Sequence, residues 1–195
     1  DRILFSFCDH TRKPEADPDA LKIPEVPALR PSERPNFHRR YFIYECASDG
    51  SWVRQLTGCA GDPMETMDGR QTVLIEDWDP CYLPDGGFVF TSTRPQSYGR
   101  CHWGRYTPCF LLYRAELPPI GAMGPVRDIR PYTFGEANEW EPSVMTDGRI
   151  LYTRWDYIDR DSTWLQSLWT AHPDGTAVAH VYGSYSRCLV TPSEA

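Results

Sequence analysis

The sequence predicts an all-β fold, a β-propeller made of four-stranded antiparallel blades, with about three blades present in the 195 residues. Three observations support this prediction: short segments that alternate apolar and polar residues, Asp-Gly turns between them, and repetition of the whole pattern along the chain. The composition agrees, because 18 Pro, 14 Gly and 13% aromatic residues favour strands and turns over long helices.

One complete unit can be followed from residue 139 to residue 183. The apolar segment EPSVM ends in a TDG turn, and RILYTR then alternates at the strand period, which places Ile150 and Tyr152 on one face. After a longer connection, QSLW is followed by a Pro-Asp-Gly turn and by AVAHVYG. Four such strands cannot bury both faces of their sheet, so the unit needs neighbours of its own kind.

The same unit occurs a second time, 62 residues earlier. The segment that begins at residue 76 aligns at this offset with the segment that begins at residue 138, and the matched positions are Trp78 with Trp140, Pro80 with Pro142, and Asp85-Gly86 with Asp147-Gly148. Agreement at Trp, Pro and Asp-Gly positions indicates an internal repeat.

The beginning of the chain matches the unit without its first strand. RILFSF repeats RILYTR, and residues 41–58 align with residues 166–183. We therefore expect one propeller segment over residues 1–195, and we expect it to be part of a larger propeller, because rings typically contain about four to eight blades. Its predicted parts are a partial blade at 1–58 with a long insertion at 9–40, blades at 76–135 and 138–183, and the start of a further blade at 184–195.

The long connections all fall at one position of the blade. They are Cys8–Arg40, Pro95–Pro108 and Trp155–Trp164, and each joins the second strand of a blade to the third. The Asp-Gly turns occupy the opposite face. Inserted sequence on one face of a rigid scaffold is where binding usually occurs, so we expect a protein partner or a small ligand there.

Several motifs resemble known propeller repeats. LPDGGFVFTSTR, DGRILYTRWDYIDR and LWTAHPDGT resemble TolB-like (PD40) repeats, and together with YGRCH at Tyr98–His102 they resemble bacterial propeller proteins related to the hydrazine synthase alpha subunit. The similarity covers most of residues 77–183. It implies a propeller scaffold and, through the second group, a subunit of a larger complex that carries c-type haem. Tyr98 stands where a Cys-x-x-Cys-His motif needs its first Cys, so haem would require a domain outside this sequence.

Net charge and cysteine content limit the kinds of function and the compartment that we expect. A formal net charge of -7 argues against a general nucleic-acid binder, which needs clustered Lys and Arg. The sequence has no apolar run near the roughly 20 residues that span a bilayer. Seven cysteines indicate an oxidising compartment, and we expect a periplasmic or extracellular location in a bacterium.

One candidate metal site lies in a predicted loop and contains Cys101, His102 and Cys109. Thiolate and imidazole groups are suitable zinc ligands. The spacing matches no standard zinc motif, so a disulfide between the two cysteines and free thiols stay open as alternatives.

A second candidate site combines acids with two tryptophans at the start of the innermost strands: Asp77, Trp78, Asp79, Glu139, Trp140 and Glu141. Carboxylates at the mouth of a propeller channel could hold Ca²⁺ or a cationic group. The alternative is a packing device between blades, in which the acids accept hydrogen bonds from neighbouring N–H groups or from Arg.

A third group lies at the end of the second strand and in the following loop: Arg94, Arg154, Asp156 and Arg160. Guanidinium groups could orient an anionic ligand. The alternative is a set of salt bridges between blades.

These patterns predict an exported binding or scaffold module. The alternatives are the propeller part of a multi-haem enzyme subunit and the gating propeller of a serine peptidase. The sequence contains no Gly-x-Ser-x-Gly, Walker or His-Glu-x-x-His motif, so no catalytic residue is assigned and enzyme activity stays open.

Overall fold

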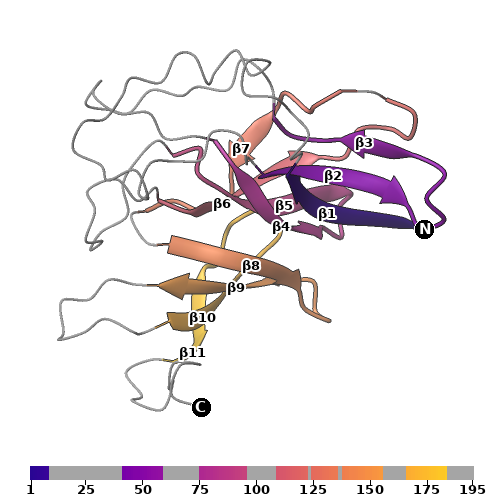
Figure 1. Ribbon diagram of the computed structural model, residues 1–195. Coiled ribbons are helices and arrows are strands. Elements are labelled where there is room, and N and C mark those ends of the chain that lie inside the picture. Colours follow the sequence, from indigo (N-terminus) through magenta and orange to yellow (C-terminus); the bar gives the residue numbers. More distant parts are fainter. Residues whose placement is uncertain are drawn as a thin grey trace, which may run out of the picture.

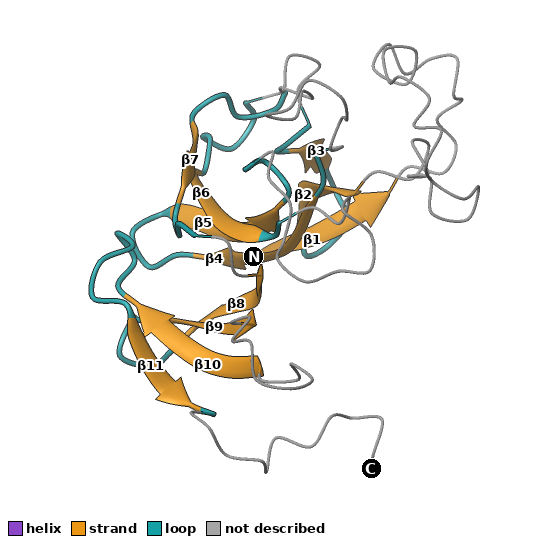
Figure 2. Cartoon of the chain, turned by 90° about the vertical axis from the view of Figure 1, so that its left-hand side faces the viewer, coloured by secondary structure: helices purple, strands orange, loops and turns teal. Residues whose placement is uncertain are grey.

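A computed structural model describes residues 1–8, 41–58, 75–95, 109–122, 124–135, 138–155 and 166–183. Every regular element within these ranges is a β-strand (Figure 2), so the all-β prediction is confirmed. The same ranges contain no helix that is long and apolar enough to cross a membrane.

The strands form three antiparallel sheets in which sequence neighbours pair (Figure 1). The first sheet contains β1 (Arg2–Cys8), β2 (Tyr41–Ala47) and β3 (Val53–Gln55). The second sheet contains β4 (Asp77–Tyr82), β5 (Gly87–Ser92), β6 (Leu111–Glu116) and β7 (Ile129–Pro131). The third sheet contains β8 (Asn138–Val144), β9 (Ile150–Trp155), β10 (Gln166–Ala171) and β11 (Ala179–Tyr182).

This arrangement is that of partial propeller blades. Within the described ranges, the first sheet has no strand that corresponds to β4 and β8, in agreement with the sequence alignment. The sheets lie within the ranges predicted for the blades, whose boundaries as domains stay predictions. The further blade expected at 184–195 lies outside the described residues.

The Asp-Gly turns all have one geometry. In each, the Asp Oδ1 accepts the backbone N–H of the residue two positions later, and the following Gly has a positive φ between 75° and 94°. The Gly N–H also donates to the carbonyl three residues before it. These are the contacts of a type I turn closed by a left-handed Gly, which fixes the register of a hairpin. The four turns are Asp49-Gly50, Asp85-Gly86, Asp147-Gly148 and Asp174-Gly175.

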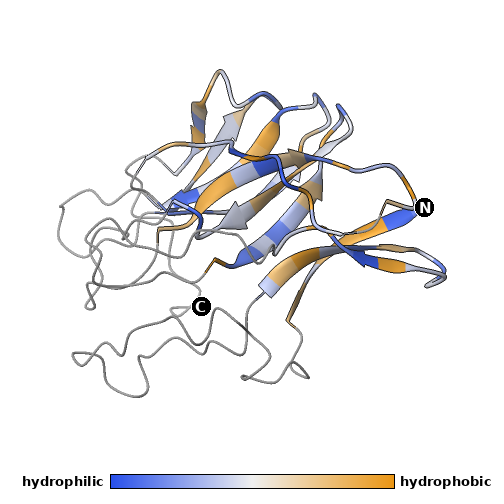
Figure 3. Ribbon diagram, turned by 90° about the horizontal axis from the view of Figure 1, so that it is seen from above, coloured by the Kyte–Doolittle hydropathy of each residue, from blue (hydrophilic) through white to orange (hydrophobic). Residues whose placement is uncertain are grey.

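Alternation along the strands creates two cores between the sheets, and the alternating colours of several strands are visible in Figure 3. Phe88 and Phe90 of β5 belong to the core that also contains Ile43 of the first sheet. Val89, which points to the opposite face, belongs to the core that contains Tyr152 of the third sheet. All six residues of β5 are buried, so the second sheet is covered on both faces.

Both innermost strands carry a β-bulge next to a Trp. The register of β4 against β5 shifts between Trp78 and Cys81, and that of β8 against β9 shifts between Trp140 and Ser143. The bulges contain the acidic residues Asp79 and Glu141, at φ values of 49° and 55°. A non-Gly residue in this conformation costs about 1–2 kcal/mol, so surrounding contacts must stabilise both bulges.

Candidate functional site

The strand ends that flank the three long connections can be placed in space. In the sheet registers Cys8 pairs with Tyr41, Ser92 with Leu111, and Trp155 with Gln166. The connections themselves lie outside the described residues, so their common face stays a prediction.

A row of aromatic side chains joins these strand ends across the sheets. The ring centroids of Tyr41 and Trp78 lie 6.3 Å apart, those of Trp78 and Phe110 5.4 Å, and those of Phe110 and Trp140 6.0 Å. Tyr41 is 38% exposed, and the other three are partly exposed. We call these four residues the aromatic rim. It shows that the ends of β2 and β6 next to two of the long connections lie on one edge of the molecule.

Backbone contacts fix the aromatic rim where neighbouring sheets meet. The Tyr41 N–H donates to Glu76 Oε1 at 3.4 Å, immediately before β4. The Glu139 N–H donates to the Phe110 carbonyl at 2.8 Å, and the Phe110 N–H donates to Asn138 Oδ1 at 3.0 Å. The beginnings of β4 and β8 are thereby tied to the beginnings of β2 and β6 in the preceding sheets, so the ring positions are set by the scaffold.

Asp77, the residue before Trp78 in the chain, is fully buried. Its carboxylate accepts hydrogen bonds from Ser92 Oγ and from the Arg94 guanidinium, each at 2.7 Å. Burial raises the pKa of Asp77, and the charge of Arg94 together with hydrogen bonds from Thr57 and Ser92 opposes that rise. Because Thr57 belongs to the first sheet and Asp77 to the second, this carboxylate links two sheets.

Glu139 repeats this arrangement one sheet further along. It is fully buried, accepts a hydrogen bond from the Thr133 hydroxyl, and lies 3.5 Å from Arg154 Nη1. Thr133 follows the last strand of the second sheet, as Thr57 follows the last strand of the first. The Arg154 guanidinium also stacks over the Trp169 ring, 4.8 Å from its centroid. Four of the predicted site residues therefore form two similar clusters, Asp77 with Arg94 and Glu139 with Arg154. Their contacts are those expected if the acids help to pack the sheets together. Each ion pair lies within one sheet, whereas each contact with Thr57 or Thr133 joins two neighbouring sheets.

The bulged acids are exposed, unlike the buried acids two residues before them. The Asp79 N–H donates to Ser6 Oγ of the first sheet at 3.0 Å. The Asp79 carboxylate in turn accepts from the Glu141 N–H and faces the Thr91 hydroxyl. Partial burial and the nearby Glu141 charge raise the pKa of Asp79. The left-handed backbone thus directs each bulge N–H towards the preceding sheet.

The described residues include no group of three or more His, Cys, Asp or Glu side chains arranged to hold a metal ion. Of the predicted zinc ligands, Cys109 is buried just before β6, whereas Cys101 and His102 lie outside the described residues. Asp156 and Arg160 also lie outside them. The zinc and calcium sites therefore stay predictions. Covalent haem does not fit the described cysteines, because none of them is followed by His.

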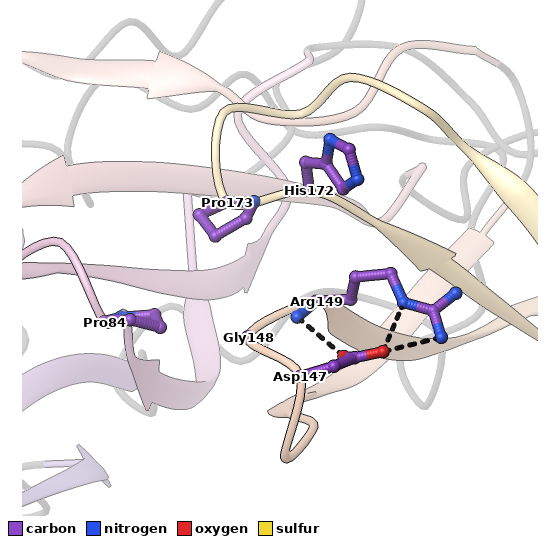
Figure 4. Close-up of a pocket in the computed structure, with 6 residues that line it drawn as sticks. All are labelled: Pro84, Asp147, Gly148, Arg149, His172 and Pro173. Atoms are coloured by element: carbon purple, nitrogen blue, oxygen red, sulfur yellow. Dashed lines mark hydrogen bonds and ion pairs between the residues drawn. The ribbon is translucent and has the colours of Figure 1, made fainter.

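The opposite edge contains a cleft that the sequence did not reveal (Figure 4). It has a volume of about 400 Å³. Pro84 comes from a turn of the second sheet and the other lining residues come from two turns of the third: Asp147, Gly148, Arg149, His172 and Pro173. The only sequence signal was the presence of Pro-Asp-Gly turns on the same edge of adjacent blades.

Most polar groups around the cleft are already engaged. Arg149 Nε donates to Asp147 Oδ2 at 2.8 Å, as the dashed lines in Figure 4 show. Arg114 Nη1 donates to the Pro173 carbonyl at 2.8 Å, and the Tyr132 hydroxyl donates to the His172 carbonyl at 2.6 Å. These contacts hold the turns of two sheets together and indicate a structural role for this edge.

The chain was compared with known proteins. No family model matches it, and no curated protein matches it. Among solved structures, a protein described as TolB from Agrobacterium tumefaciens has a TM-score of 0.48 and 16% identity over 73% of this chain and 41% of that chain. Hydrazine synthase from Kuenenia stuttgartiensis has a TM-score of 0.47 and 14% identity over 93% of this chain and 32% of that chain.

These two proteins represent the two groups that the sequence motifs resemble. The chain spans less than half the length of either one. At these identities and TM-scores the likeness carries no conclusion about activity or partners, and the fold assignment rests on the three sheets and their repeated contacts.

Proposed function

We propose that this chain is a propeller module that binds a partner at the aromatic rim and thereby acts as a binding scaffold. The observation that carries the proposal is the continuous row of partly exposed rings from Tyr41 to Trp140. Aromatic side chains combine a large apolar surface with few rotatable bonds, so they favour recognition at low entropic cost.

The chemistry beside the rim restricts the partner. Glu76, Asp79 and Glu141 lie next to the tryptophans and are partly or fully exposed. A carboxylate-flanked aromatic surface suits a protein segment or small molecule that combines an apolar group with a positive charge. The backbone groups of Tyr41 and Phe110 are hydrogen-bonded to the beginning of the next sheet, so the surface is largely formed before the partner arrives.

The proposal includes an exported location, periplasmic or extracellular. Its support is the content of seven cysteines in 195 residues. Fractionation of cells that produce the natural protein tests it. Recovery in the cytoplasmic fraction alone would contradict this part of the proposal and leave the rim proposal unaffected.

Site-specific photo-crosslinking in the natural host tests binding at the rim. A photoreactive amino acid replaces Tyr41 on the rim or, as the matched control, the exposed Thr146 in a turn at the opposite edge. We expect a discrete crosslinked product from position 41 and none from position 146. Equal crosslinking from both positions would contradict the proposal.

The partner identified in this way is then titrated against the Tyr41→Ala and Thr146→Ala variants. Loss of an aromatic contact at a binding site typically costs more than about 1 kcal/mol, so we expect affinity to fall roughly tenfold for Tyr41→Ala. The Thr146→Ala variant is expected to bind like the unchanged protein. The haem-subunit and peptidase-gating roles stay predictions of the sequence.

A further inference from the structure

Phe134 has the most exposed large apolar side chain in the part of the chain that the structure describes, with 76% of its surface accessible. It belongs to the crossover that leads from β7 to β8, and therefore lies between the second and third sheets. Single exposed apolar residues are common on protein surfaces, so exposure alone assigns no role to Phe134. Its position in the fold does.

Hydrogen bonds place Phe134 at the edge that carries the aromatic rim. The preceding residue, Thr133, donates its N–H to the Leu112 carbonyl at 3.2 Å, and its Oγ1 accepts the Leu112 N–H at 3.0 Å. Phe110 of the rim lies two residues before Leu112. The Thr133 hydroxyl also donates to Glu139, the residue before the last ring of the rim. Phe134 thus follows a residue that is fixed between two members of the rim.

The first sheet shows that this position does not need a side chain. There Thr57 makes the same contacts as Thr133, because its N–H donates to the Ile43 carbonyl at 3.3 Å and its Oγ1 accepts the Ile43 N–H at 2.9 Å. The next residue is Gly58, where an added Cβ would lie 2.7 Å from the nearest side chain. In the second sheet Phe134 follows the Thr directly, and the Gly comes one residue later. The aromatic side chain is therefore not part of the shared blade geometry, which favours a role in binding.

The exposure of Phe134 also indicates what kind of partner meets this edge. A small-molecule site is usually a concave pocket that encloses most of its ligand. A side chain that projects into solvent cannot enclose a ligand, but it can enter an apolar pocket on another protein, as the anchor residues of protein interfaces do. The rings of the rim come from three successive sheets, so a protein segment is better able to contact all of them.

The charges at this edge indicate the complementary charge of the partner. Among the described residues, the charged side chains beside the rim that are partly or fully exposed and not held in an ion pair are acids: Glu76, Asp79 and Glu141. The basic side chains there, Arg94 and Arg154, are paired with buried carboxylates of their own sheets. The edge is therefore negative, and a basic protein segment complements it.

We propose that Phe134 anchors the partner of the aromatic rim, and that this partner is a protein that offers an apolar pocket to Phe134 and basic side chains to the acids at positions 76, 79 and 141. This inference rests on the function proposed above, because it assigns a further residue and a partner class to the same surface. Phe134 and the rim are then two parts of one interface, which crosses the junction of the second and third sheets.

Photo-crosslinking in the natural host gives the first test. A photoreactive amino acid replaces Phe134 or, as the matched control, Ile120, which is 71% exposed and lies between β6 and β7 at the opposite edge. We expect position 134 to give the same crosslinked protein as position 41, and position 120 to give none. A product at position 41 without the same product at position 134 would overturn this inference alone. No product at either position would overturn the proposed function as well.

The protein identified in this way is then titrated against the Phe134→Ala and Ile120→Ala variants. Truncation of an aromatic anchor is among the costliest changes in an interface, so Phe134→Ala should weaken binding at least about tenfold. Ile120→Ala should bind like the unchanged protein. Equal affinities of Phe134→Ala and the unchanged protein would overturn the role of Phe134.

Salt dependence tests the basic character of the partner. Affinity should fall between about 0.01 and 1 M NaCl, because the Debye length falls from about 30 to about 3 Å over this range. Glu141→Gln should lower both the affinity and its salt dependence. The control is Glu116→Gln at the opposite edge, where Glu116 is 67% exposed, and it should change neither. An affinity that does not depend on salt would contradict a basic partner.

Thermal unfolding separates an anchor from a residue that packs within the chain. An exposed anchor contributes little to folding, so Phe134→Ala should leave the Tm of the isolated protein unchanged. Phe90→Ala is the reference, because Phe90 is fully buried and its truncation leaves a cavity that lowers the Tm. A clear fall in the Tm of Phe134→Ala would show that Phe134 packs within the chain and would overturn the inference.

Discussion

The Asp77 cluster allows a quantitative test of how the sheets are joined. In Asp77→Ala the carboxylate is lost, while the Arg94 side chain, only 8% exposed, stays in place without its 2.7 Å partner. Ser92 and Thr57 lose an acceptor at the same time. The same change would have little effect on stability if Asp77 served only to hold an exchangeable ligand.

The expected magnitude follows from burial. Removing one member of a buried ion pair typically costs about 3–5 kcal/mol, because the remaining charge is left uncompensated. The matched control is Asp128→Ala, which removes a carboxylate from the ion pair with Arg130, where both side chains are 68% exposed. An exposed pair of this kind contributes little to stability, because water and salt screen its charges.

Thermal unfolding followed by circular dichroism measures both changes. A chain of this length shifts its Tm by roughly 2–4 °C per kcal/mol, so Asp77→Ala should lower Tm by about 10 °C and Asp128→Ala by a few degrees at most. Equal losses of stability for the two variants would refute the assignment of Asp77 as a link between sheets.

Three further predictions concern turns, protonation and packing. Gly175→Ala should cost clearly more than the roughly 1 kcal/mol expected for Gly86→Ala in urea unfolding, because both have positive φ but only at Gly175 would a Cβ lie 2.8 Å from a backbone carbonyl; equal costs would contradict this. In carboxyl NMR titrations, Asp147 should titrate below the ordinary pKa of 3.8 and Asp77 above it. The contribution of Asp147 to stability is thus lost as pH falls below 3.8. The contribution of Asp77 instead increases as pH falls through its raised pKa towards 3.8. An Asp77 pKa below that of Asp147 would contradict the contacts described. Arg54→Lys should destabilise by about 1–3 kcal/mol in thermal unfolding, since Lys cannot bond the buried carboxylate and the carbonyls of the 118–122 loop together; an unchanged Tm would contradict this.

Much of the fold could be predicted because its signals are local. Each Asp-Gly pair specifies its own turn, through an Asp side chain that bonds two residues ahead and a Gly that tolerates positive φ. Alternation in RILYTR correctly places Ile150 and Tyr152 on one face. Both signals depend only on residues within a few positions of each other.

The candidate site was less predictable because it depends on pairing between strands. The strand period places Asp77 and Asp79 on the same face, yet the structure buries the first and exposes the second. The cause is the bulge at Asp79, which appears only when β4 is aligned with β5. Phe110 was not predicted as part of the aromatic rim, because its contact with Trp140 depends on how the second and third sheets meet.

The most direct test of the whole account is the nuclear Overhauser pattern of the aromatic rim in solution. If three successive sheets bring their strand ends to one edge, the Phe110 ring should show contacts to both Trp78 and Trp140, whose centroids lie 5.4 and 6.0 Å from it. The Trp78 ring should also show contacts to Tyr41. Contacts from Trp78 and Trp140 to residues of the Asp-Gly turns, with none to Phe110, would contradict the arrangement and remove the basis for the proposed binding surface.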